Sequence, residues 1–296
     1  MEIIGQSTAS SPQSSPAAEP IPVVTLVMIL VGLAVLGLVV LRRWWRLDAR
    51  PLRRQPTGWP GALLLMGAMI LLGAVGQSVL VWIRWPDGPP AGDALGPDDR
   101  ALLLAAGLGA QMIPVAIWGV LVVLARRRAE VPGAAPPASM IRAVIVGIAA
   151  LLVVWPVLQM VAFVGSRIAT LVTGEVPDPQ AHDMLQMLRD QPRDVWFFTS
   201  VALVTTIGPI KEEVMYRALL QGALRQVDLG PWPAILVVSL LFTGMHAPVM
   251  PLHALPALFL LSIGFGWAYE RTGRLLAPIV MHILFNIANI AITAVA

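Results

Sequence analysis

Two adjacent carboxylates, Glu212 and Glu213, lie in an otherwise apolar stretch of the chain, together with Lys211 and Arg217. Ionisable side chains at membrane depth cost about 2.5–3.5 kcal/mol each, so they usually mark a functional site. On a helix, Glu213 and Arg217 are close enough to form an ion pair, which lowers this cost. Four positions after Glu212 the chain has Tyr216, which leaves the Glu212 carboxylate partly unpaired. Such a carboxylate suits a general base, and a purely structural ion pair is the alternative.

Two further polar clusters lie in the apolar stretches that follow. Residues 242–246 read Phe-Thr-Gly-Met-His, and residues 282–286 read His-Ile-Leu-Phe-Asn. A single histidine on an apolar helix is more often structural than catalytic. Here His246, His282 and Asn286 join the two glutamates in neighbouring hydrophobic helices, and each needs a polar partner in lipid. We therefore expect the three clusters to face one another.

A carboxylate, imidazoles and a carboxamide are sufficient for the attack of water on an amide bond. Glu212 would take the proton from water, while His246, His282 and Asn286 would stabilise the oxyanion. Alternatively, Glu212, His246 and His282 could be the three protein ligands of a zinc ion. The zinc-binding pattern HExxH is absent, and Asn286 is a better oxyanion donor than zinc ligand. These points favour a mechanism without metal and leave zinc open as a cofactor.

The composition is that of an integral membrane protein. Of the 296 residues, 57% are hydrophobic and 12% are charged, and the mean hydropathy is +0.77. Soluble domains have roughly 25% charged residues. Cysteine is absent, which excludes thiolate chemistry and cysteine metal sites. The arginines flank apolar runs, where they act as topology signals, so we expect the lipid bilayer and no nucleic acid as a partner.

Apolar runs separated by short polar loops predict an all-α fold, a polytopic membrane bundle of about eight transmembrane helices. The predicted spans are residues 21–41, 61–83, 101–125, 143–164, 195–227, 232–245, 254–269 and 275–296. We divide the chain into a disordered tail (1–20), N-terminal transmembrane helices with an outer linker (21–194), and a segment with the three clusters (195–296). Residues 180–189 are expected to form an interfacial helix, and Gly37, Gly67 and Gly73 to allow close helix packing.

At the three clusters the sequence resembles the CPBP family, which comprises the type II CAAX prenyl endopeptidases and bacteriocin-processing enzymes and is also called the Abi family. The family motifs EExxxR, FxxxH and HxxxN are matched by Glu212–Arg217, Phe242–His246 and His282–Asn286. The three motifs occur in the family's order and with similar separations. The resemblance covers about residues 195–296.

This resemblance implies an intramembrane endopeptidase, a hydrolase of the cell (inner) membrane that cuts a membrane-associated protein or peptide. Eukaryotic members cut after a prenylated cysteine, so the substrate class includes lipidated proteins. Glu212 would activate the water, with Glu213 and Arg217 completing the first motif. The family is described both as metalloproteases and as glutamic proteases. A non-catalytic membrane immunity or scaffold protein of the same family is one alternative, and a transporter gated by the Glu213–Arg217 pair is another.

Overall fold

The computed structural model describes residues 23–47, 57–90, 95–125, 137–177, 188 and 193–295, and every regular element in them is a helix. The all-α prediction is confirmed. The predicted tail (1–20) and, except for Leu188, the predicted interfacial helix (180–189) lie outside the described residues. The first helices are α1 (Val23–Leu41), α2 (Gly58–Arg84), α3 (Pro97–Ala125) and α4 (Met140–Thr173). The last are α9 (Pro231–His246), α10 (Leu255–Thr272) and α11 (Leu276–Val295).

Between α4 and α9, residues 195–226 form one continuous helix with two π-helical segments. Its parts are α6 (Val195–Ala202), η2 (Leu203–Ile207), α7 (Gly208–Glu213), η3 (Val214–Gln221) and α8 (Gly222–Gln226). The Asp194 side chain caps its start by accepting hydrogen bonds from the backbone N–H groups of Trp196 and Phe197. Asp228, with φ of 61°, turns the chain at its end. π-helical turns are rare and occur frequently at functional sites.

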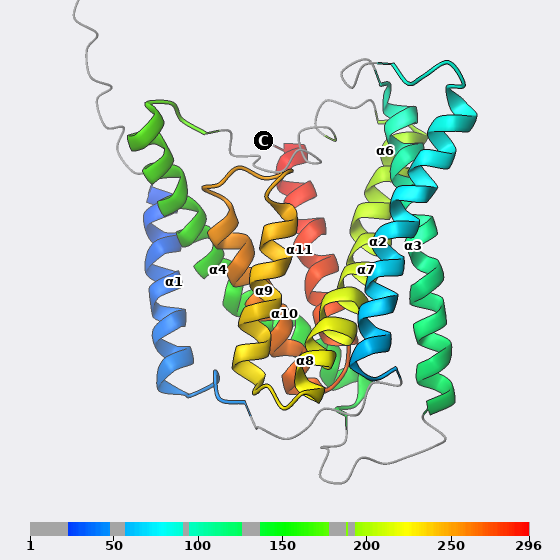
Figure 1. The fold of residues 1–296 in the computed structure, drawn as a ribbon. Coiled ribbons are helices and arrows are strands. Elements are labelled where there is room, and N and C mark those ends of the chain that lie inside the picture. Colours follow the sequence, from blue (N-terminus) through cyan, green and yellow to red (C-terminus); the bar gives the residue numbers. More distant parts are fainter. Residues whose placement is uncertain are drawn as a thin grey trace, which may run out of the picture.

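The helices surround the polar clusters (Figure 1). α10 and α11 pack against α4, and α1 packs against α4 as well. The α2–α3 pair lies on the opposite side of the molecule, where α2 contacts η3 and α8. η3 also contacts α9 and α10. The continuous helix 195–226 is therefore enclosed by its neighbours along its second half, where η3 is buried at every residue.

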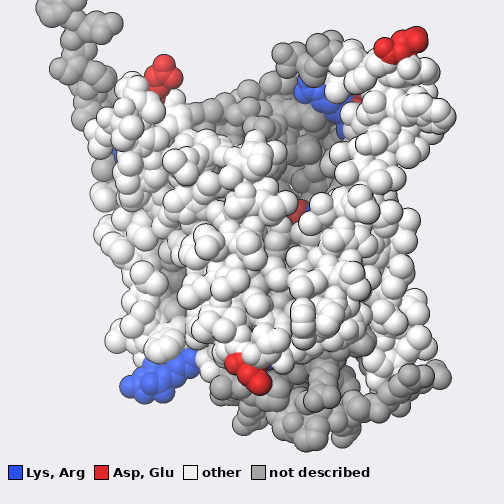
Figure 2. Space-filling view, viewed as in Figure 1, with Lys and Arg blue, Asp and Glu red and all other residues white. Residues whose placement is uncertain are grey.

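Four helices are long and apolar enough to cross a membrane: α2, α3, α4 and the helix Leu252–Thr272, which contains α10. Shorter apolar helices cover Ile29–Leu41, Pro231–His246 and Leu276–Ile292. On the face shown in Figure 2, uncharged side chains dominate the middle, and charged ones lie mainly near the upper and lower ends. An acidic side chain is visible at the lower end of a hollow on this face. The protein is thus an integral membrane protein, and the number of eight crossings stays a prediction.

Close helix approach depends on particular glycines. A Cβ added at Gly147 of α4 would meet the backbone carbonyl oxygen of Ala277 in α11. One added at Gly73 of α2 would meet the side chain of Gln111 in α3, which confirms the prediction for Gly73. At Gly37 and Gly67 no described atom lies within 4 Å of such a Cβ, so the prediction of close packing was wrong there.

Candidate active site

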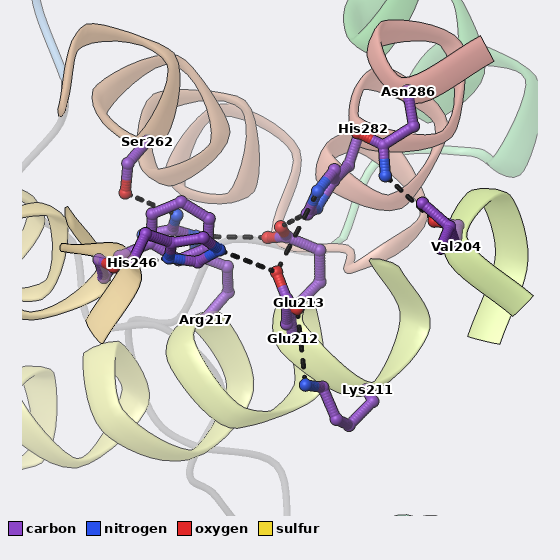
Figure 3. A network of polar contacts seen from close by, with 10 residues as sticks. Val204, Lys211, Glu212, Glu213, Arg217, His246, Ser262, His282 and Asn286 are labelled. Atoms are coloured by element: carbon purple, nitrogen blue, oxygen red, sulfur yellow. Dashed lines mark hydrogen bonds and ion pairs between the residues drawn. The ribbon is translucent and has the colours of Figure 1, made fainter. Parts of the chain in front are cut away.

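The polar groups of the three motifs come from three helices, the continuous helix 195–226, α9 and α11, and meet in one place (Figure 3). Glu212 and Glu213 are the last residues of α7. His246 is the last residue of α9, and His282 lies in the second turn of α11. Ser262 of α10 completes the group through a bond to Arg217. The expectation that the clusters face one another is therefore met by the side chains of five of the six motif residues.

Glu213 is at the centre of a buried network. Its Oε2 accepts a hydrogen bond from Nε of Arg217 at 3.1 Å, and both side chains are 0% exposed. Its Oε1 lies 2.8 Å from Nδ1 of His282. Arg217 donates from Nη2 to Oγ of Ser262 at 2.8 Å and lies over the ring of Phe242, 5.7 Å from its centroid. A buried charge is tolerated only when it is paired and hydrogen-bonded, and this pair fulfils both conditions.

Both histidine rings are held through Nδ1. Nδ1 of His246 lies 2.8 Å from the carbonyl oxygen of Phe242, and Nδ1 of His282 faces the Glu213 carboxylate. Because carbonyl and carboxylate oxygens only accept hydrogen bonds, Nδ1 carries the hydrogen in each neutral ring, and Nε2 is then an acceptor. The His282 ring also stacks on Phe265, with centroids 4.6 Å apart. The orientation and the tautomer of both rings are thus determined by their neighbours.

Glu212 lies between the two rings. Its Oε2 is 4.0 Å from Nε2 of His246 and 4.0 Å from Nε2 of His282, and its side chain is 19% exposed. Oε2 thus faces two acceptor nitrogens, and a hydrogen-bond donor placed between these atoms could bridge them. The arrangement therefore suits a molecule such as water, which can donate to a carboxylate and to an imidazole at once.

Glu212 has a basic partner that the sequence argument did not find. Nζ of Lys211 lies 3.3 Å from Oε1 of Glu212, and the lysine side chain is 14% exposed. The expectation of a partly unpaired Glu212 was therefore wrong. Adjacent residues on a regular helix do not face each other, which is why the pair could not be read from helical spacing. The contact fixes one carboxylate oxygen and leaves the other toward the histidines.

Asn286 has a different partner from the one predicted. Its Nδ2 donates to the backbone carbonyl oxygen of Val204, at 2.9 Å, in the π-helical segment η2 (Figure 3). This bond ties α11 to η2. A role as oxyanion donor would have to use the second N–H of the same amide group, and it stays a prediction.

The donor set does not fit the zinc ion that was left open as an alternative for Glu212, His246 and His282. Zinc bonds of about 2.0–2.1 Å at tetrahedral angles bring ligand atoms to about 3.3 Å from one another. The separations of 4.0 Å between Oε2 and each Nε2 are wider. Within the described part of the chain, no group of three or more histidine or acidic side chains is arranged to hold a metal ion.

Three contributors to the site carry no motif and were missed. Lys211 contacts Glu212, Ser262 accepts from Arg217, and Phe265 stacks on His282. A serine and a phenylalanine on an apolar helix give no distinct signal in the sequence. Lys211 was noted in the sequence as a cation at membrane depth, where such residues are rare, but its contact with Glu212 was not predicted.

Comparison with known proteins agrees with the position of the site. Residues 194–288 match the family model described as type II CAAX prenyl endopeptidase Rce1-like. An uncharacterized 24.3 kDa protein of Escherichia coli is 31% identical over 77 residues, which cover 26% of this chain and 36% of that protein. The matched region thus spans about a third of that relative's length. No solved structure matches the chain. The resemblance to the CPBP family is confirmed for residues 194–288.

Proposed function

We propose that this chain, whose residues 194–288 match the Rce1-like family model, is an intramembrane endopeptidase that uses a glutamate-activated water. The main support is the position of Glu212, whose Oε2 lies 4.0 Å from Nε2 of both His246 and His282. Both Nε2 atoms are acceptors in the neutral tautomers that their Nδ1 contacts require. A water in this position would have acceptors for both of its hydrogens.

In the proposed reaction, Glu212 takes one proton from this water while the second hydrogen is held by an imidazole Nε2. The water oxygen bonds to the carbon of the scissile amide, and the carbonyl oxygen becomes an oxyanion. Glu212 then gives its proton to the amide nitrogen, the C–N bond breaks, and a carboxylic acid and an amine leave. The carboxylate is unchanged after each turnover, and no cofactor takes part in a step.

Stabilisation of the oxyanion requires a hydrogen-bond donor. His282 could supply one from Nε2 in its doubly protonated form, with the Glu213 carboxylate, 2.8 Å from its Nδ1, balancing the charge; the neutral His246 ring would then keep its Nε2 as the acceptor for the water. Arg217 holds Glu213 in place through the bond to Oε2. The second N–H of Asn286 is the other candidate donor. We assign Glu213 and Arg217 to positioning and charge balance, and Glu212 to proton transfer.

The substrate we propose is a membrane-associated protein or peptide, and the class includes lipidated ones. Water-poor surroundings strengthen the electrostatic interactions within such a site. The side chains of Glu212, His246 and His282 are 19%, 19% and 7% exposed, so a substrate must reach a largely enclosed site. We place the protein in the cell (inner) membrane as a multi-pass protein.

The proposal is tested with the full chain in liposomes, using a membrane-bound reporter peptide and the variants Glu212→Gln and His246→Ala. Each variant should lower kcat at least about 100-fold, the scale of general acid–base catalysis. His253→Ala is the matched control, because this histidine lies outside the site and should keep wild-type turnover. Full turnover in both site variants would contradict the proposal. Metal analysis of the same sample tests the zinc alternative, which predicts about one bound ion per chain.

A further inference from the structure

A second row of buried polar side chains continues from the candidate site along the helix 195–226 toward α8, which lies near the lower end of the molecule in Figure 1. We name this row the polar ladder. It connects the continuous helix 195–226 to α10, and it is formed by Arg217, Gln221 and Arg225 on one side and by Ser262, Gly266 and Glu270 on the other. Its first rung, from Arg217 to Ser262, is visible in Figure 3.

The rungs keep one register. Nη2 of Arg217 donates to Oγ of Ser262 at 2.8 Å, and Nε2 of Gln221 donates to the carbonyl oxygen of Gly266 at 3.3 Å; each rung joins residues 45 positions apart. The third rung, an ion pair of 3.3 Å between Nε of Arg225 and Oε1 of Glu270, has the same separation. The two helices thus run parallel, each using every fourth residue for the contact.

Glu270 links the last two rungs. Its Oε1 accepts from Nε2 of Gln221 at 2.9 Å as well as facing Arg225. The Gln221 side chain is 0% exposed, and those of Arg225 and Glu270 are 6% and 3% exposed. Because both partners of the Gln221 amide nitrogen are acceptors, the orientation of this amide is determined. Gly266 is part of the fit, since a Cβ there would lie 3.1 Å from Oε1 of Gln221.

The polar ladder stabilises η3, a segment of unusual backbone geometry. A regular α-helix in the same place would need less support from its neighbours. η3 (Val214–Gln221) is π-helical and begins directly after Glu213. π-helical turns are rare, so a segment of eight such residues depends on contacts with its neighbours. Arg217 and Gln221 fix the rotation of η3 relative to α10. Glu212 lies directly before Glu213 and η3 on the same continuous helix, so the rotation of η3 also determines the direction of the Glu212 side chain.

We propose that Gln221 and Glu270 are positioning residues, which hold η3 against α10 so that Glu212 faces His246 and His282. This inference rests on the proposed function. Neither residue touches the reacting atoms in this arrangement; they act through the backbone of η3. Loss of the ladder should therefore affect the rate of the chemical step more than the binding of the substrate.

The test compares the variants Gln221→Met and Arg225→Met/Glu270→Met with the wild type in liposomes. The double variant removes both charges together, so no unpaired charge stays buried. We expect kcat to fall at least about tenfold with KM changed less than about twofold, because small displacements of catalytic groups lower rates strongly. Thr170→Val is the matched control: this partly buried hydroxyl of α4 lies outside the three motifs and donates to the carbonyl oxygen of Ser166 in its own helix, and its loss should leave kcat unchanged.

Hydrogen exchange of the amides in η3 gives a readout that does not depend on proteolysis. In both ladder variants these amides should exchange at least about tenfold faster than in the wild type, as expected when a segment opens more often. If the η3 amides exchange at the wild-type rate, or if both variants keep the wild-type kcat, the inference is overturned. The ion pair between Arg225 and Glu270 would then only stabilise the fold. If the wild type itself cleaves no substrate, the proposed function fails, and the exchange measurement alone decides whether the ladder holds η3.

Discussion

The two adjacent glutamates have opposite environments. Glu213 is fully buried, and each of its carboxylate oxygens has a partner, Arg217 or His282. Glu212 is partly exposed, with one oxygen near Lys211 and the other toward the two Nε2 atoms. Consecutive side chains on a helix point about 100° apart, which separates the two groups. Our mechanism requires these two environments: Glu213 stays fixed and balances charge, and Glu212 transfers the proton.

Lys211 should matter for the rate, because it holds Oε1 of Glu212 at 3.3 Å. In Lys211→Met this carboxylate can rotate away from the histidines. A hydrogen bond to a charged group contributes about 1.5–3 kcal/mol, and partial exposure reduces this, so we expect kcat to fall about tenfold. Lys211→Arg, which keeps a cation, should retain most of the activity. Michaelis–Menten analysis in liposomes checks this. A higher KM with unchanged kcat would show instead that Lys211 binds the substrate.

At the scale of helices, spacing in the sequence was sufficient to predict which elements form and which faces meet. Apolar runs predicted the helices. The free-energy cost of unpaired polar groups in lipid predicted that Glu212, His246 and His282 lie together, and in the structure they do. Spacing could not predict η2 and η3, because π-helical turns depend on tertiary contacts. For the same reason, the bond from Asn286 to the carbonyl oxygen of Val204 in η2 had no signal in the sequence.

The approach of α4 to α11 should control the position of His282. A Cβ at Gly147 would meet the backbone oxygen of Ala277, five residues before His282, and a backbone atom cannot move aside as a side chain can. Overpacking of this kind costs about 1–3 kcal/mol, so Gly147→Ala should lower both the thermal midpoint and kcat. Gly67→Ala, with no described atom within 4 Å of the new Cβ, is the control. Equal midpoints and rates in the two variants would contradict this account.

At the scale of the whole molecule, the first helix is connected to the helices of the site by a short turn. Nε1 of Trp267 in α10 donates to the carbonyl oxygen of Trp44, and Nε1 of Trp232 in α9 donates to that of Trp45, each at 3.1 Å. Arg43, with φ of 53°, gives this turn its left-handed backbone. Trp232 and Trp267 thus bind α9 and α10 to the end of α1.

These two bonds should stabilise the protein without taking part in the reaction. A neutral hydrogen bond contributes about 0.5–1.5 kcal/mol, so the double variant Trp232→Phe/Trp267→Phe should lose about 1–3 kcal/mol of stability. We expect a lower thermal midpoint and faster hydrogen exchange in residues 42–46, with kcat within about twofold of the wild type. Trp82→Phe is the control, because Trp82 is 75% exposed. A large loss of kcat at an unchanged midpoint would mean that the turn after α1 acts on the site itself, and that the N-terminal helices do more than support the fold.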